Sequence, residues 1–333
     1  MQNPNDDMRI FSCYQSALEY WRINRVIPVN SISRKNRANV PNKPPSVKQV
    51  RSLGLKIPVH VMFRDSNKRW GSQSMVQHIF MEDAPAGSFL NVNDELEVSS
   101  PEFCFLQMAR QLSLIELIEL GYELCGSYSI PNEGDCKVPD RGFHNRKPLT
   151  SIKRISELVE QMPGFRGQVK AMRALRYLSD GSASPMETKL TMFLTLPYRL
   201  GGFGLPAPKL NARITPSKAA RKSSSKAFYI CDLFWPEHDL AVEYDSDLFH
   251  TGAEHIADDS RKRNALTLMG VTVITVTTKQ LYNRKEFDKT VRVIAKCLGK
   301  RLVYNPPDFF TANRKLRKEL LSFDDLVKDN RIF

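Results

Sequence analysis

Short runs of alternating apolar and polar residues in the first half of the chain predict β-strands. The segments IPVHVMF (57–63) and SMVQHIFM (74–81) are rich in apolar and β-branched residues, as strands are. FLNVND (89–94) and LEVSS (96–100) predict a further short pair of strands. Together these runs indicate a small sheet before residue 100.

Helical patterns follow these strands. Ser99 and Glu102 fit a capping box, and Pro101 suits the first turn of a helix. The apolar stretch 103–125 then predicts two short helices that form a core. Strands followed by helices favour an α+β module for this part of the chain.

Helical periodicity returns between residues 150 and 177. Arg166, Lys170 and Arg173 recur there at i, i+4 and i+7, on one face of the predicted helix. A basic stripe of this kind suits contact with phosphate groups, and a solvated surface is the alternative.

The second half predicts a β-hairpin after a helix. The run Ser184-Pro185-Met186-Glu187 again has the residues of a helix start, and the capping role alone would explain Glu187. Residues 228–235 alternate as a strand does, 236–239 have the composition of a tight turn, and 240–244 predict the returning strand.

A helix, a strand and a last helix follow the hairpin. Residues 255–269 have helical spacing and end at Gly270, as a C′ glycine should. The continuous β-branched run 271–276 predicts a strand buried on both faces. A further helix, about 285–298, closes the unit.

These patterns divide the chain into four parts. We expect an N-terminal α+β module with a basic, proline-rich arm (1–140), a helical linker (150–182), an α/β domain (183–305) and a C-terminal helical tail (306–333). The fold class is therefore α/β, or α+β overall, with a mixed sheet flanked by helices.

Composition and net charge indicate which kinds of molecule this protein is expected to bind. The chain has 333 residues, of which 41% are hydrophobic, and 49 Lys and Arg against 36 Asp and Glu give a net charge of +13. Such a charge favours a polyanionic partner, nucleic acid before anionic membrane. No apolar run is long enough to span a bilayer, and the polar start differs from a secretion signal. Six scattered cysteines favour neither a zinc site nor disulfides, and we expect a cytoplasmic protein.

Basic residues gather in two segments without acidic neighbours. Residues 34–56 and 211–226 are candidates for contact with a nucleic-acid backbone, although each also reads as a solvated loop. The second segment supplies three candidate contact residues, Arg221, Lys222 and Lys226.

Three acids fall on the predicted hairpin. Asp232 lies in the first strand, Glu243 comes level with it across the turn, and Asp245 shares a face with Glu243 because side chains alternate. Three converging carboxylates need a counter-charge, and oxygen ligands favour Mg²⁺ or Mn²⁺. His250 follows on a short loop that could return to this cluster. The alternatives are an inactive fold with paired acids, a loop-capping Asp245 and a structural His250.

At these residues the chain resembles a known superfamily. Asp232, Glu243-x-Asp245, His250, Gly270 and the VTVITVT strand resemble the PD-(D/E)XK restriction-endonuclease-like superfamily, in its very-short-patch-repair-like branch, over about 185–300. The resemblance implies metal binding by the first acid and the glutamate, Asp232 and Glu243, and a helix glutamate at Glu187.

The resemblance also has departures. Asp245 stands where much of the superfamily has a lysine, Ser246 replaces a common glycine, and Lys262 replaces an arginine. Arg261, Lys262 and Arg263 would ordinarily form a solvated helix face. If the scissile phosphate lies nearby, they are candidates for contact with the nucleic acid.

Two functions follow as expectations. The leading one is a Mg²⁺-dependent DNA endonuclease of phage defence or DNA repair, with Asp245 and His250 acting on the attacking water. RNA stays open as a substrate, and a homodimer would supply two sites for double-strand cutting. Region 50–130 is loosely similar to AbiEi-type antitoxins, which implies the alternative of a non-catalytic DNA-binding regulator that keeps a nuclease-like fold.

Overall fold

The chain forms two compact units, residues 1–178 and 179–333, which are described separately here. The computed structural model describes residues 9–24, 39–132, 134, 142–217, 227–245, 253–304 and 306–321, with the backbone alone for 253–257 and 306. None of the described helices is both long enough and apolar enough to cross a membrane.

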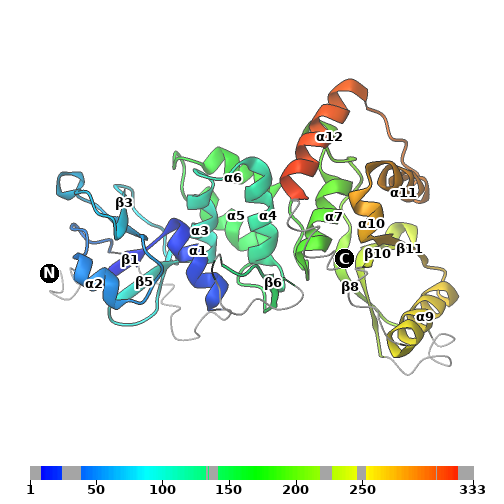
Figure 1. Cartoon of the computed structure of the whole chain (residues 1–333), viewed down its shortest axis with the longest axis horizontal. Helices are drawn as coiled ribbons and strands as arrows, with labels where there is room; N and C mark the ends of the chain where they lie inside the picture. Colours follow the sequence, from blue (N-terminus) through cyan, green and yellow to red (C-terminus); the bar gives the residue numbers. More distant parts are fainter. Residues whose placement is uncertain are drawn as a thin grey trace. The chain divides into compact units, whose positions relative to one another are not determined.

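A five-stranded mixed sheet, in the order β3-β2-β1-β5-β4, forms one part of the first unit (Figure 1). The expected strands are confirmed, and a first strand that the sequence pattern did not reveal lies at the centre. The strands are β1 (Ile10–Ser12), β2 (Val59–Phe63), β3 (Met75–Ile79), β4 (Phe89–Asn91) and β5 (Leu96–Ser99).

Helices pack beside this sheet. The expected pair after residue 100 is confirmed as α3 and α4, but the N-cap of α3 is Ser100 rather than Ser99, and its hydroxyl accepts from the N–H of Phe103. Glu102 does not close a capping box, because its carboxylate instead accepts from the hydroxyl of Thr150 at 2.7 Å. The helices are α1 (Tyr14–Ile23), α2 (Val47–Ser52), α3 (Pro101–Met108), α4 (Leu114–Cys125), α5 (Ile152–Glu160) and α6 (Gln168–Leu175). The unit also contains a short 3₁₀ turn, η3 (Ser66–Lys68), and a strand pair, β6 (Tyr128–Ser129) and β7 (His144–Asn145).

Residues 150–178 are not a linker, which corrects the expected division. Helices α5 and α6 pack against α3 and α4 in the first unit, and Ile155 and Ala171 are fully buried. The basic stripe is also interrupted, because Arg166 lies in the turn before α6 begins at Gln168. The apolar face of this segment is therefore core, and the first unit extends to Leu178.

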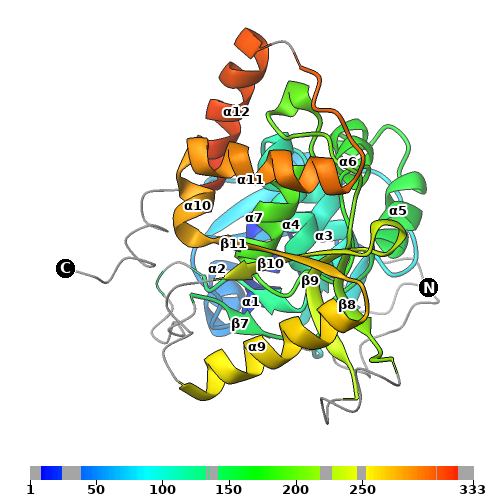
Figure 2. The same cartoon turned by 90° about the vertical axis from the view of Figure 1, so that its right-hand side faces the viewer.

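The second unit is built on a four-stranded sheet in the order β11-β10-β9-β8. Helix α9 covers one face, while α7 and α11 lie on the other (Figure 2). Strand β8 was not expected, because its basic and polar residues favoured a loop, although Leu210, Ala212 and Ile214 alternate with them as in a strand. The elements are α7 (Pro185–Thr195), η4 (Tyr198–Leu200), β8 (Lys209–Ile214), β9 (Tyr229–Trp235), η5 (Pro236–His238), β10 (Leu240–Asp245), α9 (Ala253–Leu268), β11 (Thr272–Thr277), α10 (Thr278–Tyr282), α11 (Arg284–Cys297) and α12 (Pro306–Leu320).

The predicted hairpin is confirmed, and the strand after it differs from the expectation. β9 and β10 pair antiparallel around η5, and Asp239 closes the turn in the left-handed region with φ 42°. β11 pairs parallel to β10 through the α9 crossover, but only Val276 within it is buried. The reason is its place at the edge of the sheet, where it has one neighbouring strand.

The expected C-terminal tail is part of the second unit as far as it is described. α12 buries Phe309, Leu316 and Leu320, and the side-chain amide of Asn313 donates to the carbonyl of Gly201 at 2.7 Å. These contacts tie α12 to the η4 turn, so the unit includes it.

Candidate active site

The two acids expected to bind metal lie next to each other in the sheet. Regular pairing of β9 with β10 ends at Val242 opposite Leu233, and Glu243 and Asp232 are the residues that directly follow and precede this pair. There the backbone N–H of Tyr244 donates to Asp232 Oδ2 at 2.8 Å. The aspartate is thus fixed by the strand that carries the glutamate.

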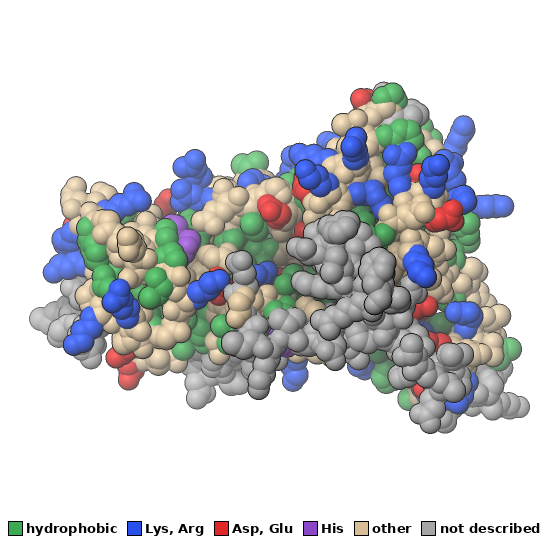
Figure 3. All heavy atoms as spheres, viewed as in Figure 1, with side chains coloured by type: hydrophobic (Ala, Val, Ile, Leu, Met, Phe, Trp, Pro, Cys, Tyr) green, Lys and Arg blue, Asp and Glu red, His purple; other side chains and the backbone are tan. Residues whose placement is uncertain are grey.

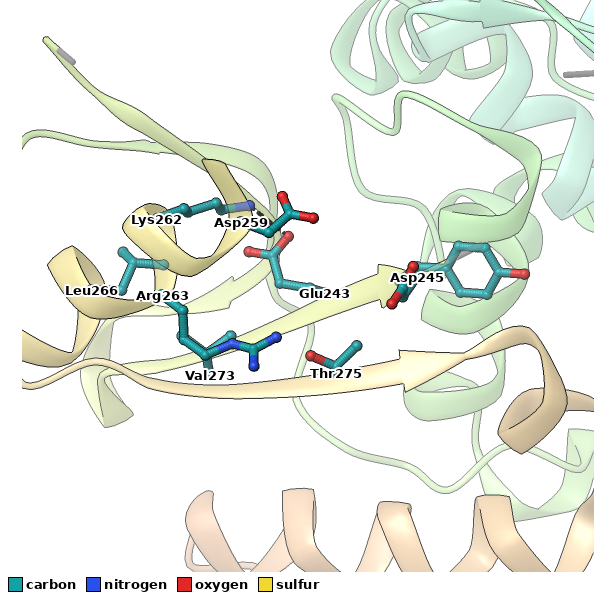
Figure 4. A pocket seen from close by; sticks show the side chains of 9 residues that line it. Glu243, Asp245, Asp259, Lys262, Arg263, Leu266, Val273 and Thr275 are labelled. Atoms are coloured by element: carbon teal, nitrogen blue, oxygen red, sulfur yellow. Dashed lines mark hydrogen bonds and ion pairs between the residues drawn. The ribbon is translucent and has the colours of Figure 1, made fainter. Parts of the chain in front are cut away.

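Glu243 is held from the side of α9. Lys262 Nζ lies 2.8 Å from Glu243 Oε2, and the two side chains are only 25% and 17% exposed (Figure 4). The other oxygen, Glu243 Oε1, is buried and has no hydrogen-bond partner in the described part of the chain. A buried, unpartnered carboxylate oxygen is costly, and a cation or water would satisfy it.

Glu187 approaches from α7 and is fully engaged. Its Oε2 accepts from the N–H of Ala183 at 3.0 Å and from Asn211 Nδ2 at 2.6 Å, while its own N–H donates to the N-cap hydroxyl of Ser184. Asn211 occupies the left-handed region with φ 46° on β8, and its amide also donates to the carbonyl of Gly181. Glu187 therefore links the start of α7 to β8.

Electrostatics connect the three carboxyl groups. Burial raises the pKa of Asp232 well above its usual range, and the negative charges of Glu243 and Glu187 raise it further. The hydrogen bond from the Tyr244 N–H and the positive charge of Lys262 lower this pKa in part. Burial likewise raises the pKa of Glu187. The pKa of Lys262 is also raised, because its attraction to Glu243 and Asp232 outweighs burial. Lys262 thus remains an ammonium ion that offsets part of the negative charge.

A small pocket of about 90 Å³ opens beside Glu243, between β10, β11 and α9 (Figure 4). Asp245 lies two residues further along β10 than Glu243, and Arg263 extends from α9 toward Thr275 of β11. Acidic and basic side chains therefore share one solvent-accessible hollow, which suits a phosphate group held near a cation. The lining residues are Glu243, Tyr244, Asp245, Asp259, Lys262, Arg263, Leu266, Val273 and Thr275.

The carboxylates fit a divalent cation in part. Among the residues that the structure describes, no three His, Cys, Asp or Glu side chains form a group able to hold a metal ion. Asp232 and Glu243 nevertheless offer oxygen donors from adjacent strands, and no N–H or O–H group of the described residues donates to Glu243 Oε1, although the buried Cys231 thiol lies near this carboxyl. This donor set suits Mg²⁺ or Mn²⁺, which commonly bind one or two carboxylates and complete their shell with water and substrate oxygens.

Several predicted residues are placed elsewhere or fall outside the description. His250 lies outside the described residues, as do Arg221, Lys222 and Lys226. Arg261 pairs with Asp258 on the exposed side of α9, away from Glu243. In the first unit, Lys170 donates to the carbonyl of Leu112 at 2.8 Å, whereas Arg166 and Arg173 are exposed.

Sequence reasoning missed the roles of Lys262 and Asn211. Lys262 was expected to contact nucleic acid, but it contacts Glu243, which lies 19 residues earlier on another element. The i, i+4 spacing of Lys262 and Leu266, a buried residue of α9, was the available signal that Lys262 faces the sheet. Nothing in the sequence around Asn211 indicated its contact with Glu187.

The chain was compared with protein families, curated proteins and solved structures. No protein-family model, curated protein or solved structure matches the chain. The interpretation of the site therefore rests on its own residues and their geometry.

Proposed function

We propose that the second unit is a metal-dependent endonuclease that hydrolyses phosphodiester bonds of DNA, with RNA as the alternative substrate. The observation that supports this most is the pair of acids on adjacent strands, Asp232 with a raised pKa and Glu243 with one unpartnered buried oxygen. Perturbed, converging acids beside a small polar pocket are typical of catalytic sites. Phage defence or DNA repair in the cytoplasm, by a homodimer where both strands are cut, is the context we propose.

Each residue of the site would have a separate role in this reaction. Asp232 and Glu243 would hold Mg²⁺ or Mn²⁺, which when bound lowers the pKa of water and stabilises charge on the phosphate. Lys262 pairs with the Glu243 carboxylate and would hold it in position. Arg263, which reaches into the same pocket, would bind a phosphate oxygen, and Asp245 would accept a hydrogen bond from the attacking water.

Plasmid cleavage tests the proposal. Supercoiled DNA is incubated with the full chain in Mg²⁺ or Mn²⁺, beside Asp232→Asn and Glu243→Gln, with Asp239→Asn in the exposed turn as the matched control. We expect nicking by the native protein and by Asp239→Asn, and at least about a hundredfold loss in the two site variants. Nicking that persists in Asp232→Asn and Glu243→Gln would disprove the assignment.

The second candidate is a non-catalytic DNA-binding regulator of the antitoxin type. One observation favours it: Lys262 already pairs with Glu243, and Glu187 already has two donors, so much of the cluster is neutralised by the protein itself. This function predicts DNA binding without cleavage in either metal, and no effect of Mg²⁺ or Mn²⁺ on thermal stability.

A further inference from the structure

Helix α11 has one apolar, buried face and one basic, exposed face. Phe287, Val291, Ile294 and Leu298 are buried at i, i+4, i+7 and i+11, and they pack into the second unit. The outward-facing basic residues have the same spacing and form one stripe along the helix: Lys285, Lys289, Arg292 and Lys296.

Positive charge is dense around this stripe. Residues 284–320 contain 11 Lys and Arg and 4 Asp and Glu, which gives this segment a net charge of +7. No acidic residue occurs from 289 to 307. Figure 3 shows Lys and Arg side chains gathered over α11 and α12, where Arg314, Lys315 and Lys318 are also exposed. A solvated helix face ordinarily mixes both signs, whereas α11 carries no acidic residue after Asp288.

The stripe leads to an open hollow after the helix ends. Arg292, Lys296, Lys300 and Arg301 line this hollow, whose volume is about 570 Å³. None of these four side chains forms an ion pair with a described residue, in contrast to Lys289, which pairs with Glu286 at 2.8 Å. Four unpaired cations around one concave surface attract a group with several negative charges.

We propose that this basic face, defined as Lys285, Lys289, Arg292, Lys296, Lys300 and Arg301, binds the phosphate backbone of a nucleic acid. From Lys285 to Lys296 the helix extends about 16 Å. A duplex of that length carries about ten phosphate charges. Contacts to phosphate groups carry no information on base sequence, so binding through this face does not select a sequence.

A lipid surface fits the same charge less well. A helix that binds a membrane needs a free apolar face to insert among the acyl chains. The apolar face of α11 is already buried against the unit, and Phe193 packs on Phe287 with ring centroids 5.7 Å apart. The buried apolar face of α11 therefore favours a soluble polyanion over a membrane.

The basic face is separate from the candidate active site. α11 lies on the opposite side of the sheet from α9, which lines the pocket beside Glu243 (Figure 2). The proposal thus stands whether or not the second unit cleaves DNA, and the face would anchor a strand in either candidate function.

Equilibrium binding tests the proposal. The full chain is titrated into a fluorescent 30-base-pair duplex without divalent metal, over a range of salt concentrations, beside the triple variant Arg292→Gln, Lys296→Gln, Lys300→Gln. We expect the affinity to fall at least about tenfold and the slope of log K against log salt to decrease by about 2–3, because each lost phosphate contact removes about 0.9. Far-ultraviolet circular dichroism should be unchanged, since the buried face of α11 is intact.

A matched variant separates this face from net charge. Lys153→Gln, Arg176→Gln, Lys209→Gln removes the same charge from exposed positions elsewhere and should leave affinity and slope near those of the native protein. Equal losses in both triple variants, or native binding in the first, would overturn the proposal. So would binding to phosphatidylserine vesicles without binding to the duplex. Failure of cleavage with binding retained refutes only the nuclease.

Discussion

Lys262 Nζ lies 2.8 Å from Glu243 Oε2, so a cation supplied by helix α9 reaches the acids of the β9–β10 hairpin. The same carboxylate raises the pKa of Asp232, which Lys262 lowers. Lys262 therefore offsets part of the negative charge at Glu243 and Asp232. A divalent metal at Asp232 and Glu243 would have to share Glu243 with this ammonium group or displace it.

The first prediction concerns this competition. Without divalent metal, Lys262→Met should lower the free energy of unfolding by about 1–3 kcal/mol, because it leaves charged, buried acids without their partner. In millimolar Mg²⁺ or Mn²⁺ it should gain more thermal stability than the native protein gains, since the metal no longer competes with an ammonium ion. Differential scanning fluorimetry with and without metal measures both effects.

Arg261→Met is the control for that measurement. Arg261 is adjacent in sequence but pairs with Asp258 on the exposed side of α9. It should leave the metal response unchanged. An identical metal-induced shift in Lys262→Met and in the native protein would mean that no metal binds at Glu243.

The second prediction concerns Asp232. Its pKa in the folded protein lies above the value of about 4 in the unfolded chain, so the folded state holds the proton more tightly. The carboxyl therefore contributes stability at low pH that is lost as the pH rises through the folded pKa. Asp232→Asn, whose oxygen can still accept from the Tyr244 N–H, should stabilise the protein by about 1–3 kcal/mol at pH 7 and by little at pH 4.

Urea denaturation at the two pH values measures that difference. Asp239→Asn, in the exposed turn of the same hairpin, should change stability little at either pH, since Asn also tolerates the left-handed region. If Asp232→Asn destabilises the fold at pH 7, burial of a charged carboxyl does not strain this site.

The hairpin and its acids could be predicted because the signals are local. A turn at 236–239 between two alternating runs fixes the register, which pairs Val242 with Leu233 and brings Asp232 and Glu243 to the same end of the hairpin. The α9 crossover and the cap at Gly270 follow from helical spacing and a positive φ of 79°. Each of these features depends on residues fewer than twenty positions apart.

The features that were missed depend on distant residues. The apolar alternation of strand β8 covers only six residues, too few to predict a strand without its partner, and β8 pairs with β9. The run 271–276 has the composition of a central strand, yet no strand in the described part of the chain pairs with its outer edge. Neither composition nor period states how many neighbours a strand will have. The extent of the first unit, to Leu178, could not be predicted for the same reason. The apolar faces of α5 and α6 indicate that these helices are buried, but not that they pack against α3 and α4.

The third prediction tests the contact between Glu187 and β8. Asn211 donates to Glu187 Oε2 at 2.6 Å and to the carbonyl of Gly181 at 3.0 Å, from a left-handed backbone. Asn211→Gly removes both hydrogen bonds but tolerates the positive φ, and should cost about 1–2 kcal/mol of unfolding free energy. Asn211→Ala adds backbone strain and should cost about 1 kcal/mol more. Equal stability of the glycine variant and the native protein in urea denaturation would show that these hydrogen bonds add nothing net.

The fourth prediction concerns a histidine pair in the first unit. His78 Nε2 lies 3.0 Å from His60 Nδ1, and the ring of Tyr14 stacks on His78 with a centroid distance of 4.1 Å. Burial, followed by the charges of His60, Arg110 and Arg69, lowers the pKa of His78 to about 3. Burial also lowers the pKa of His60. Between about pH 6.5 and pH 3 the unfolded chain therefore binds a proton at His78 that the folded unit does not.

Stability should accordingly fall as the pH drops through that window, with a slope of up to about 1.4 kcal/mol per pH unit from His78. His78→Gln removes the titrating ring, so the unfolding free energy of the variant should depend less on pH between 6.5 and 4. Urea denaturation followed by tryptophan fluorescence at pH 7.5, 6 and 4.5 gives both slopes. His238→Gln, in the exposed η5 turn, serves as the control and should keep the native slope. A native slope in His78→Gln would mean that the acid sensitivity arises from other groups.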